Sequence, residues 1–225
     1  MTQDVPGAEA QGSVDAFAAL AAHQLGEAIA LVRGATAILE TDGGARGPHG
    51  DDALRALSAG AARAQRFVDD LLDLVRAGRE PDDADGADLD AALDAAAARL
   101  AAPLERVTLQ RDPLRRAGIE QSEAECLLGH VLRSALSAGA GRIRVGAEEE
   151  AGEVVLRVLD DGTPAAAGVD PLAPFSRPRG RGALVGAGVS LTVCRRIAER
   201  RGGTLTLVTG DDATTLVTAR LPAAS

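Results

Sequence analysis

The sequence contains no lysine, asparagine, tryptophan or tyrosine, and aromatic residues make up 1% of its 225 residues. Its core must therefore be built from alanine, leucine, valine and isoleucine, within a hydrophobic fraction of 46%. All of the basic side chains except the histidines are arginine, and acidic residues outnumber them, so the net charge is -9. This charge argues against a nucleic-acid-binding protein, because such proteins normally present a basic face.

Long apolar runs are absent as well. None reaches the roughly 18–20 residues that span a bilayer, and the first dozen residues lack the basic and apolar segments of a signal peptide. The two cysteines, Cys126 and Cys194, lie far apart without metal-ligand spacing, so we expect buried, reduced thiols and no metal site. These features predict a cytoplasmic protein without a membrane span.

Residues 14–80 are predicted to form a helical hairpin. In each half, apolar residues alternate by three and four positions, which is the spacing of a heptad seam. Gly43 and Gly44, between the halves, are typical helix stops. Two helices alone bury such seams poorly, so we expect two copies to form a four-helix bundle as a homodimer. The seam residues are Val14, Ala18, Ala21, Leu25, Ala28, Val32, Ala35 and Leu39, followed by Leu54, Leu57, Ala61, Ala64, Val68, Leu71 and Val75.

Residues 88–225 show a mixed pattern of helices and alternating strands. The predicted fold class is therefore α+β, an antiparallel helical hairpin followed by an α/β sandwich. Residues 1–13 are expected to be disordered, and the acidic residues 81–87 to be a linker. The expected helices are 88–102, 120–138 and 187–201, and the expected strands are 106–110, 142–149, 153–160 and a hairpin at the end of the chain, with 161–186 as a loop.

His23 is the histidine whose position allows chemistry. Because Leu25 lies on the seam, His23 falls at the heptad position farthest from it and faces outward. The spacing alone leaves two interpretations open, an ordinary surface histidine and an exposed nucleophile. His49 lies in the predicted turn and His130 inside a predicted helix, and neither has sequence neighbours that suggest chemistry.

Several dispersed segments resemble the catalytic core of bacterial sensor histidine kinases, over nearly the whole chain from about residue 14. The segment AHQLGEAIALVRGATAIL resembles the phospho-acceptor box of that family, in its phytochrome-type variant, with His23 as acceptor. The segment RAQRFVDDLLDLVRAGRE resembles the second helix of the dimerisation domain. The resemblance therefore implies a dimerisation and histidine phosphotransfer domain over residues 14–80 and a histidine-kinase-type ATPase domain over 88–225.

Three further segments resemble the nucleotide site of the family. The segment VLDDG, with Asp160 and Gly162, resembles the adenine-recognising turn; APFSR, with Phe175 and Arg177, resembles part of the nucleotide lid; and GAGVSLTVCRRIAERRGG, with Gly186 and Gly188, resembles the second glycine box. The resemblance implies ATP and Mg²⁺ as cofactors and a response regulator receiver domain as partner. An upstream sensor protein is a further expected partner, since we recognise no sensor segment.

In such a protein the imidazole of His23 carries the phosphoryl group between ATP and an aspartate of the regulator. A neutral imidazole is the attacking form, and an ordinary histidine is mostly neutral at pH 7. In the family a carboxylate usually follows the histidine, but Gln24 stands there. Glu27 lies one helical turn on, either as an orienting group for His23 or as a solvated surface glutamate.

The nucleotide motifs depart from the family pattern. Ala138 stands where the family has a metal-binding asparagine, and a methyl group cannot ligate a hard cation. Pro164 and Ser190 replace expected glycines. Each remaining motif residue also has a purely structural interpretation: Asp160 as a cap of its turn, Gly186 and Gly188 as a loop-to-helix turn, and Arg177, with Arg179 and Arg181, as a solvated loop.

Three functions stay open on this sequence. The first is a soluble histidine kinase that tolerates its altered site, and the second is a histidine phosphotransferase whose sandwich has lost the nucleotide. The third is a non-enzymatic pseudokinase that pairs with an active kinase. The absent metal ligand favours the second or third, whereas the family's usual activity favours the first. We therefore expect a phosphorelay protein, a histidine protein kinase or phosphotransferase, with weak or absent autophosphorylation by ATP.

Overall fold

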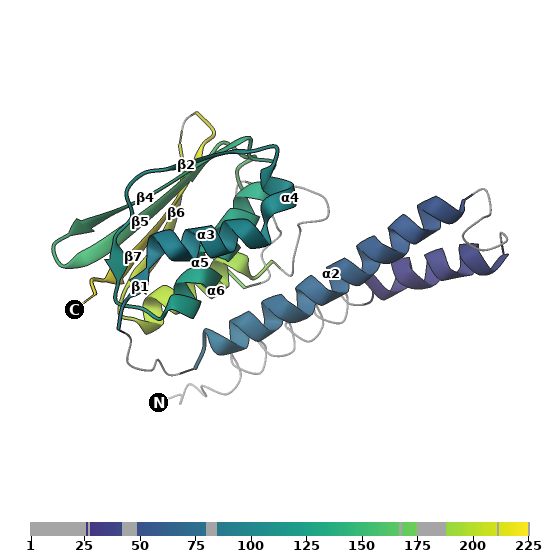
Figure 1. The fold of residues 1–225 in the computed structure, drawn as a ribbon, viewed down its shortest axis with the longest axis horizontal. Helices are drawn as coiled ribbons and strands as arrows, with labels where there is room; N and C mark the ends of the chain where they lie inside the picture. Colours follow the sequence, from purple (N-terminus) through teal and green to yellow (C-terminus); the bar gives the residue numbers. More distant parts are fainter. Residues whose placement is uncertain are drawn as a thin grey trace, which may run out of the picture. The chain divides into compact units, whose positions relative to one another are not determined.

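The chain divides into two compact units, Met1–Asp69 and Asp70–Ser225. The computed structural model describes residues 26, 28–41, 49–79, 85–166, 168–174, 188–210 and 212–224 (Figure 1). Among these residues, no helix combines the length and the apolarity needed to cross a membrane.

The first unit is a pair of helices. Residues 28–41 are helical, and α2 (Gly50–Arg76) begins after the predicted turn and continues into the second unit. The two helices approach closely at Gly60, where a Cβ would lie 2.8 Å from Val32 Cγ2 and 3.1 Å from the Ala28 carbonyl oxygen. A residue without a side chain permits this contact. The predicted helical hairpin is thus confirmed over the described residues.

Within a single chain, the buried face of α2 lies one position away from several residues of the predicted seam. Leu54 and Val75 of the predicted seam are 42% and 60% exposed. The exposed residues form an apolar stripe of the kind that the predicted homodimer would cover, and the homodimer stays a prediction. The buried residues recur every seven positions as Ala53, Gly60, Phe67 and Leu74.

The second unit contains a mixed sheet of five strands with the order β2-β4-β5-β7-β6. Strand β2 pairs parallel to β4, and the other neighbours are antiparallel. The strands are β2 (Thr108–Arg111), β4 (Arg142–Glu150), β5 (Glu153–Asp160), β6 (Thr204–Thr209) and β7 (Thr215–Pro222). A separate two-stranded ribbon, which the sequence did not predict, pairs β1 (Ala87–Asp88) with β3 (Arg116–Ala117).

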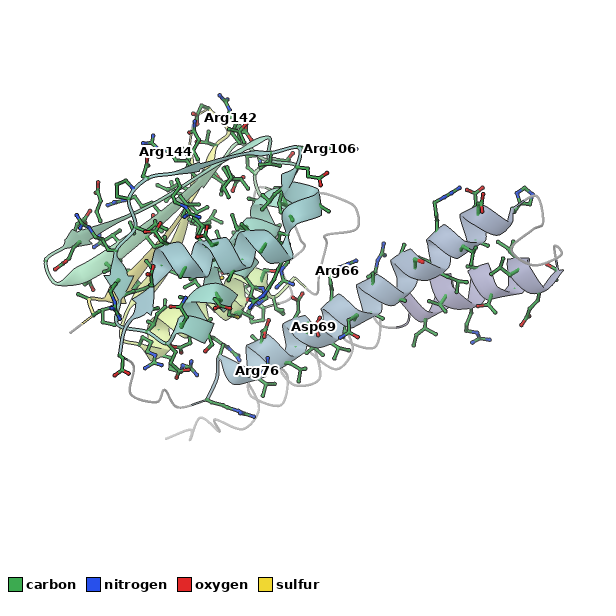
Figure 2. The ribbon with its side chains drawn as sticks, viewed as in Figure 1. Arg66, Asp69, Arg76, Arg106, Arg142 and Arg144 are labelled. Atoms are coloured by element: carbon green, nitrogen blue, oxygen red, sulfur yellow. The ribbon has the colours of Figure 1, made fainter. Side chains whose placement is uncertain are left out.

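One face of the five-stranded sheet is covered by helices. Along β4, Ile143, Val145 and Ala147 are buried while Arg142 and Arg144 are exposed, which is the two-residue alternation of a half-covered strand. Figure 2 shows the two arginines on the side of the sheet away from α3 and α5. This arrangement confirms the predicted α/β sandwich.

The covering layer consists of α3 (Leu89–Arg99), α5 (Gln121–Ser137) and α6 (Ser190–Arg200), with the short α4 (Ala101–Leu104) after α3 (Figure 1). Helix α5 lies in the middle of this layer and buries residues on almost every side. It begins with a capping box in which the Glu123 side chain accepts a hydrogen bond from the Glu120 backbone N–H at 2.9 Å. Arg201, which follows α6, donates to the same carboxylate at 2.8 Å. The two helices are therefore linked by charge as well as by apolar packing.

Replacing Gly203 with alanine is expected to destabilise the sandwich. A Cβ at this position would overlap the backbone carbonyl of Arg220 on β7, so the strand pairing must shift. We expect a loss of about 1–3 kcal/mol in the free energy of unfolding, measured by urea denaturation.

The matched control is Gly129→Ala in the middle of α5, where a Cβ would meet nothing within 4 Å. Because alanine favours a helix over glycine by about 1 kcal/mol, this variant should be as stable as the parent or more so. Equal destabilisation by the two substitutions would contradict the packing described here.

Candidate functional site

The turn after β5 contains Asp160 and Gly162 of the VLDDG motif. Asp160 is 2% exposed, and its Oδ1 accepts a hydrogen bond from the Gly162 backbone N–H at 3.0 Å. The strand register places Asp160 opposite Ile143 of β4 and Thr215 of β7, so neighbours on both sides fix its position. The buried carboxylate thus caps the turn that leaves the strand.

The turn packs against the end of α5. The backbone N–H of Thr163 donates to the Ala138 carbonyl at 2.8 Å. A Cβ on Gly162 would lie 2.7 Å from Ala138 Cβ and 2.9 Å from Asp160 Oδ1. Glycine is therefore required by close approach, and Ala138 lies directly beside the turn.

Asp161 faces a different partner from Asp160. Its Oδ1 accepts hydrogen bonds from the backbone N–H groups of Arg142, at 2.8 Å, and Gly141, at 2.7 Å. These bonds, the one from Arg142 first, hold the pKa of Asp161 below its usual range despite the opposing effect of burial. The second acid of the VLDDG motif therefore anchors the start of β4, which leaves Asp160 as the acid at the turn itself.

The predicted phosphate end of the site lies at the start of α6. Gly188 has a φ of +73°, a conformation that glycine adopts without strain, and the helix follows from Ser190. The Thr192 hydroxyl donates to the Leu172 carbonyl at 3.0 Å, which ties the loop of residues 168–174 to the first turn of α6. Asp160, Gly162 and Gly188 are thus placed on strand and helix ends, as their motifs indicated.

The other predicted site residues lie outside the described residues. These residues are His23 and Glu27 in the hairpin and Phe175, Arg177 and Gly186 in the predicted lid and second glycine box. Their assigned roles stay predictions.

Sequence reasoning missed a polar cluster around His130. This histidine is 1% exposed, its Nε2 lies 3.2 Å from Asp73 Oδ2, and its Nδ1 lies 2.7 Å from Arg133 Nη2. Burial lowers the pKa of His130, so the ring is neutral, accepts from Arg133 and donates to Asp73. The sequence neighbours of His130 gave no sign of this cluster, because one partner lies 57 residues away in the sequence.

Comparisons with known proteins show a likeness of fold and a family match over part of the chain. Residues 123–225 match the family model described as histidine kinase-, DNA gyrase B- and HSP90-like ATPase. The Acinetobacter baumannii histidine kinase AdeS has a TM-score of 0.69 at 16% identity, over 90% of this chain and 98% of that one. A search of curated proteins found no significant match.

Two mycobacterial structures match a smaller share of the chain. The sensor histidine kinase MprB has a TM-score of 0.53 at 17% identity, over 61% of this chain and 95% of that one. The ATP binding domain of PrrB from Mycobacterium tuberculosis has a TM-score of 0.50 at 19% identity, over 64% of this chain and 99% of that one. At these identities the likeness is one of fold.

The contact between Ala138 at the end of α5 and the turn at Gly162 and Thr163 is called the joint below. A double-mutant cycle tests this joint. Gly162→Ala is expected to cost about 1–3 kcal/mol of unfolding free energy, because the new methyl group meets Ala138 Cβ and Asp160 Oδ1. Ala138→Gly removes one of these obstacles, so the double variant should recover part of the loss, with a coupling energy of about 0.5 kcal/mol or more in urea denaturation. Simple additivity of the two effects would show that the residues do not touch.

Proposed function

Because residues 123–225 match the family model described as histidine kinase-, DNA gyrase B- and HSP90-like ATPase, within a chain that has the fold of a histidine kinase catalytic core, we propose that this protein is a two-component phosphorelay protein. It carries phosphoryl on His23 and exchanges it with an aspartate of a response regulator receiver domain. Its own transfer of phosphoryl from ATP to His23 is weak or absent.

The adenine half of the nucleotide site fits a nucleotide. Asp160 is a buried carboxylate at a strand end, an acceptor of the kind that an adenine amino group requires. Its Oδ1 and the Gly162 N–H hold the turn in a fixed shape. This chain's own residues thus supply an acceptor and a glycine-permitted close approach on that side of the site.

The metal-binding part of the candidate nucleotide site does not fit Mg²⁺. Ala138, beside the Gly162 turn, offers a methyl group where the resemblance expects an oxygen ligand, and a hard cation requires oxygen. The nearby Ser137 hydroxyl already donates to the Ser134 carbonyl at 3.0 Å, inside the last turn of α5. Since the metal neutralises much of the charge in phosphoryl transfer from ATP, this mismatch carries the proposal of weak or absent autophosphorylation.

Exchange with a receiver domain makes no demand on that metal position. The neutral imidazole of His23 attacks the phosphorus of the regulator's aspartyl phosphate, a P–N bond forms, and the P–O bond to the aspartate breaks. The proton on the attacking imidazole's other nitrogen is held by Glu27 or passes to solvent, because Glu27 lies one helical turn from His23. The outward heptad position of His23 supports access by a second protein.

A fully active soluble histidine kinase is the second candidate, favoured by the retained Asp160–Gly162 turn. A pseudokinase that only binds partners is the third, and it requires no chemistry at His23. The active kinase needs nucleotide, metal and His23, and the proposed phosphotransferase needs only His23. The pseudokinase needs none of the three, so two experiments separate the candidates.

Nucleotide titration of the full chain, with and without Mg²⁺, tests the metal half of the site. We expect the affinity for ATP to change by less than about twofold on adding Mg²⁺, and no transfer of radiolabel from ATP to the protein. The variant Ala138→Asn restores an amide oxygen and is expected to gain magnesium dependence. Tight magnesium-dependent binding and autophosphorylation by the unaltered chain would establish the active kinase instead.

Labelling by phosphorylated receiver domains tests His23. Receiver domains from the same genome, phosphorylated with acetyl phosphate, should transfer phosphoryl to the unaltered chain, while His23→Ala should lose the label entirely, because the accepting nitrogen is gone. The control His49→Ala removes an exposed histidine of the turn and should be labelled normally. Label retained by His23→Ala would refute the assignment.

A further inference from the structure

A cysteine, a histidine and an aspartate meet where the end of α2 packs on α5. Cys126 and His130 are four residues apart on α5 and so share one face of that helix, and Asp73 lies in the last turn of α2. Their ligand atoms all lie within 4.8 Å of one another. We propose that Asp73, Cys126 and His130 form a zinc site that joins α2 to α5.

The donor set matches the chemistry of zinc. Zn²⁺ prefers thiolate, imidazole and carboxylate ligands in a tetrahedron, and its bonds of about 2.0–2.3 Å place ligand atoms roughly 3.3–3.8 Å apart. A hard cation such as Mg²⁺ would avoid sulfur, and a Cu⁺ ion would not favour the carboxylate. Small side-chain movements bring the three groups from their present separation to zinc-binding distance.

Two hydrogen bonds position His130 within the cluster. His130 donates through Nε2–H to Asp73 Oδ2 at 3.2 Å and accepts at Nδ1 from Arg133 at 2.7 Å. Zinc would replace the Nε2 proton, the ring proton would move to Nδ1, and the thiol proton of Cys126 would leave to solvent. Since Nδ1–H and a guanidinium N–H are both donors, Arg133 would turn away from the ring. Arg133 would remain ion-paired with Asp70, because Arg133 Nη2 lies 3.1 Å from Asp70 Oδ1.

An ion can reach the cluster from solvent. A cavity of about 290 Å³ is lined by Asp73 and Cys126, together with Glu120, Glu123 and Arg76. The two ligands therefore have one side open while His130 is fully enclosed. A water molecule from this cavity is the natural fourth ligand, and the bound metal would fasten the last turn of α2 to the central helix of the sandwich.

The test is titration of the purified, metal-free full chain with Co²⁺ and then Zn²⁺. We expect one Co²⁺ per chain, with the charge-transfer absorption of a cobalt–thiolate bond and the intense d–d bands of four-coordinate cobalt, and displacement of these bands by Zn²⁺. Cys126→Ser should abolish the thiolate band, and Cys126→Ser and Asp73→Asn should each weaken Zn²⁺ binding by at least about tenfold.

Two variants control for binding elsewhere. Cys194→Ala removes the other thiol, which is buried and donates to the Leu127 carbonyl, and His49→Ala removes an exposed histidine, so both should keep the cobalt spectrum and the zinc affinity. Thermal unfolding with and without Zn²⁺ provides a second measurement, since zinc should raise the Tm of the unaltered chain but not of Cys126→Ser. No thiolate band in the unaltered chain, or the same band in Cys126→Ser, would overturn the proposal.

Discussion

The joint between the end of α5 and the turn after β5 is the constraint on which the candidate site depends. Thr163 donates to the Ala138 carbonyl, and Gly162 leaves no space for a side chain against Ala138. Neither side of the joint can withdraw, because β5 is paired on both edges and α5 is enclosed within the helical layer. Whatever residue occupies position 138 must lie beside the Asp160 turn, so its side chain decides what that part of the site can coordinate.

Helix α5 connects this joint to the rest of the second unit. Its first turn is held by the Glu123 carboxylate and Arg201, its middle carries Cys126 and His130, and Ala138 caps its end. At 1.5 Å per residue, His130 and Ala138 are separated by about 12 Å along the helix axis. A metal bound by the middle of α5 would therefore fix the last turn of α2 on the same rigid element that forms the floor of the candidate nucleotide site.

Local patterns predicted most of the sandwich but little of its long-range detail. The alternation of Ile143, Val145 and Ala147 with arginines predicted β4, because a strand covered on one face imposes a period of two. The ribbon of β1 and β3 was missed, since two residues per strand carry no period. In α2 the hydrophobic pattern pointed to Leu54, whereas its small neighbour Ala53 is the residue buried within the single chain. The contact of His130 with Asp73 joins distant parts of the sequence, and no spacing rule reveals it.

The same geometry decides which motif residues bear on nucleotide chemistry. Asp160 and Gly162 resemble an adenine-recognising turn, yet both have sufficient structural reasons to be present: the carboxylate caps the turn, and the glycine avoids Ala138. A protein that never bound ATP would still need them to keep β5 and α5 joined. Ala138 is different, because an asparagine there would serve a bound metal ion rather than the joint, whose hydrogen bond uses only the backbone carbonyl of that residue. The identity of residue 138 therefore says more about phosphoryl transfer from ATP than the Asp160–Gly162 turn does, and it is the stronger ground for the proposed phosphorelay function.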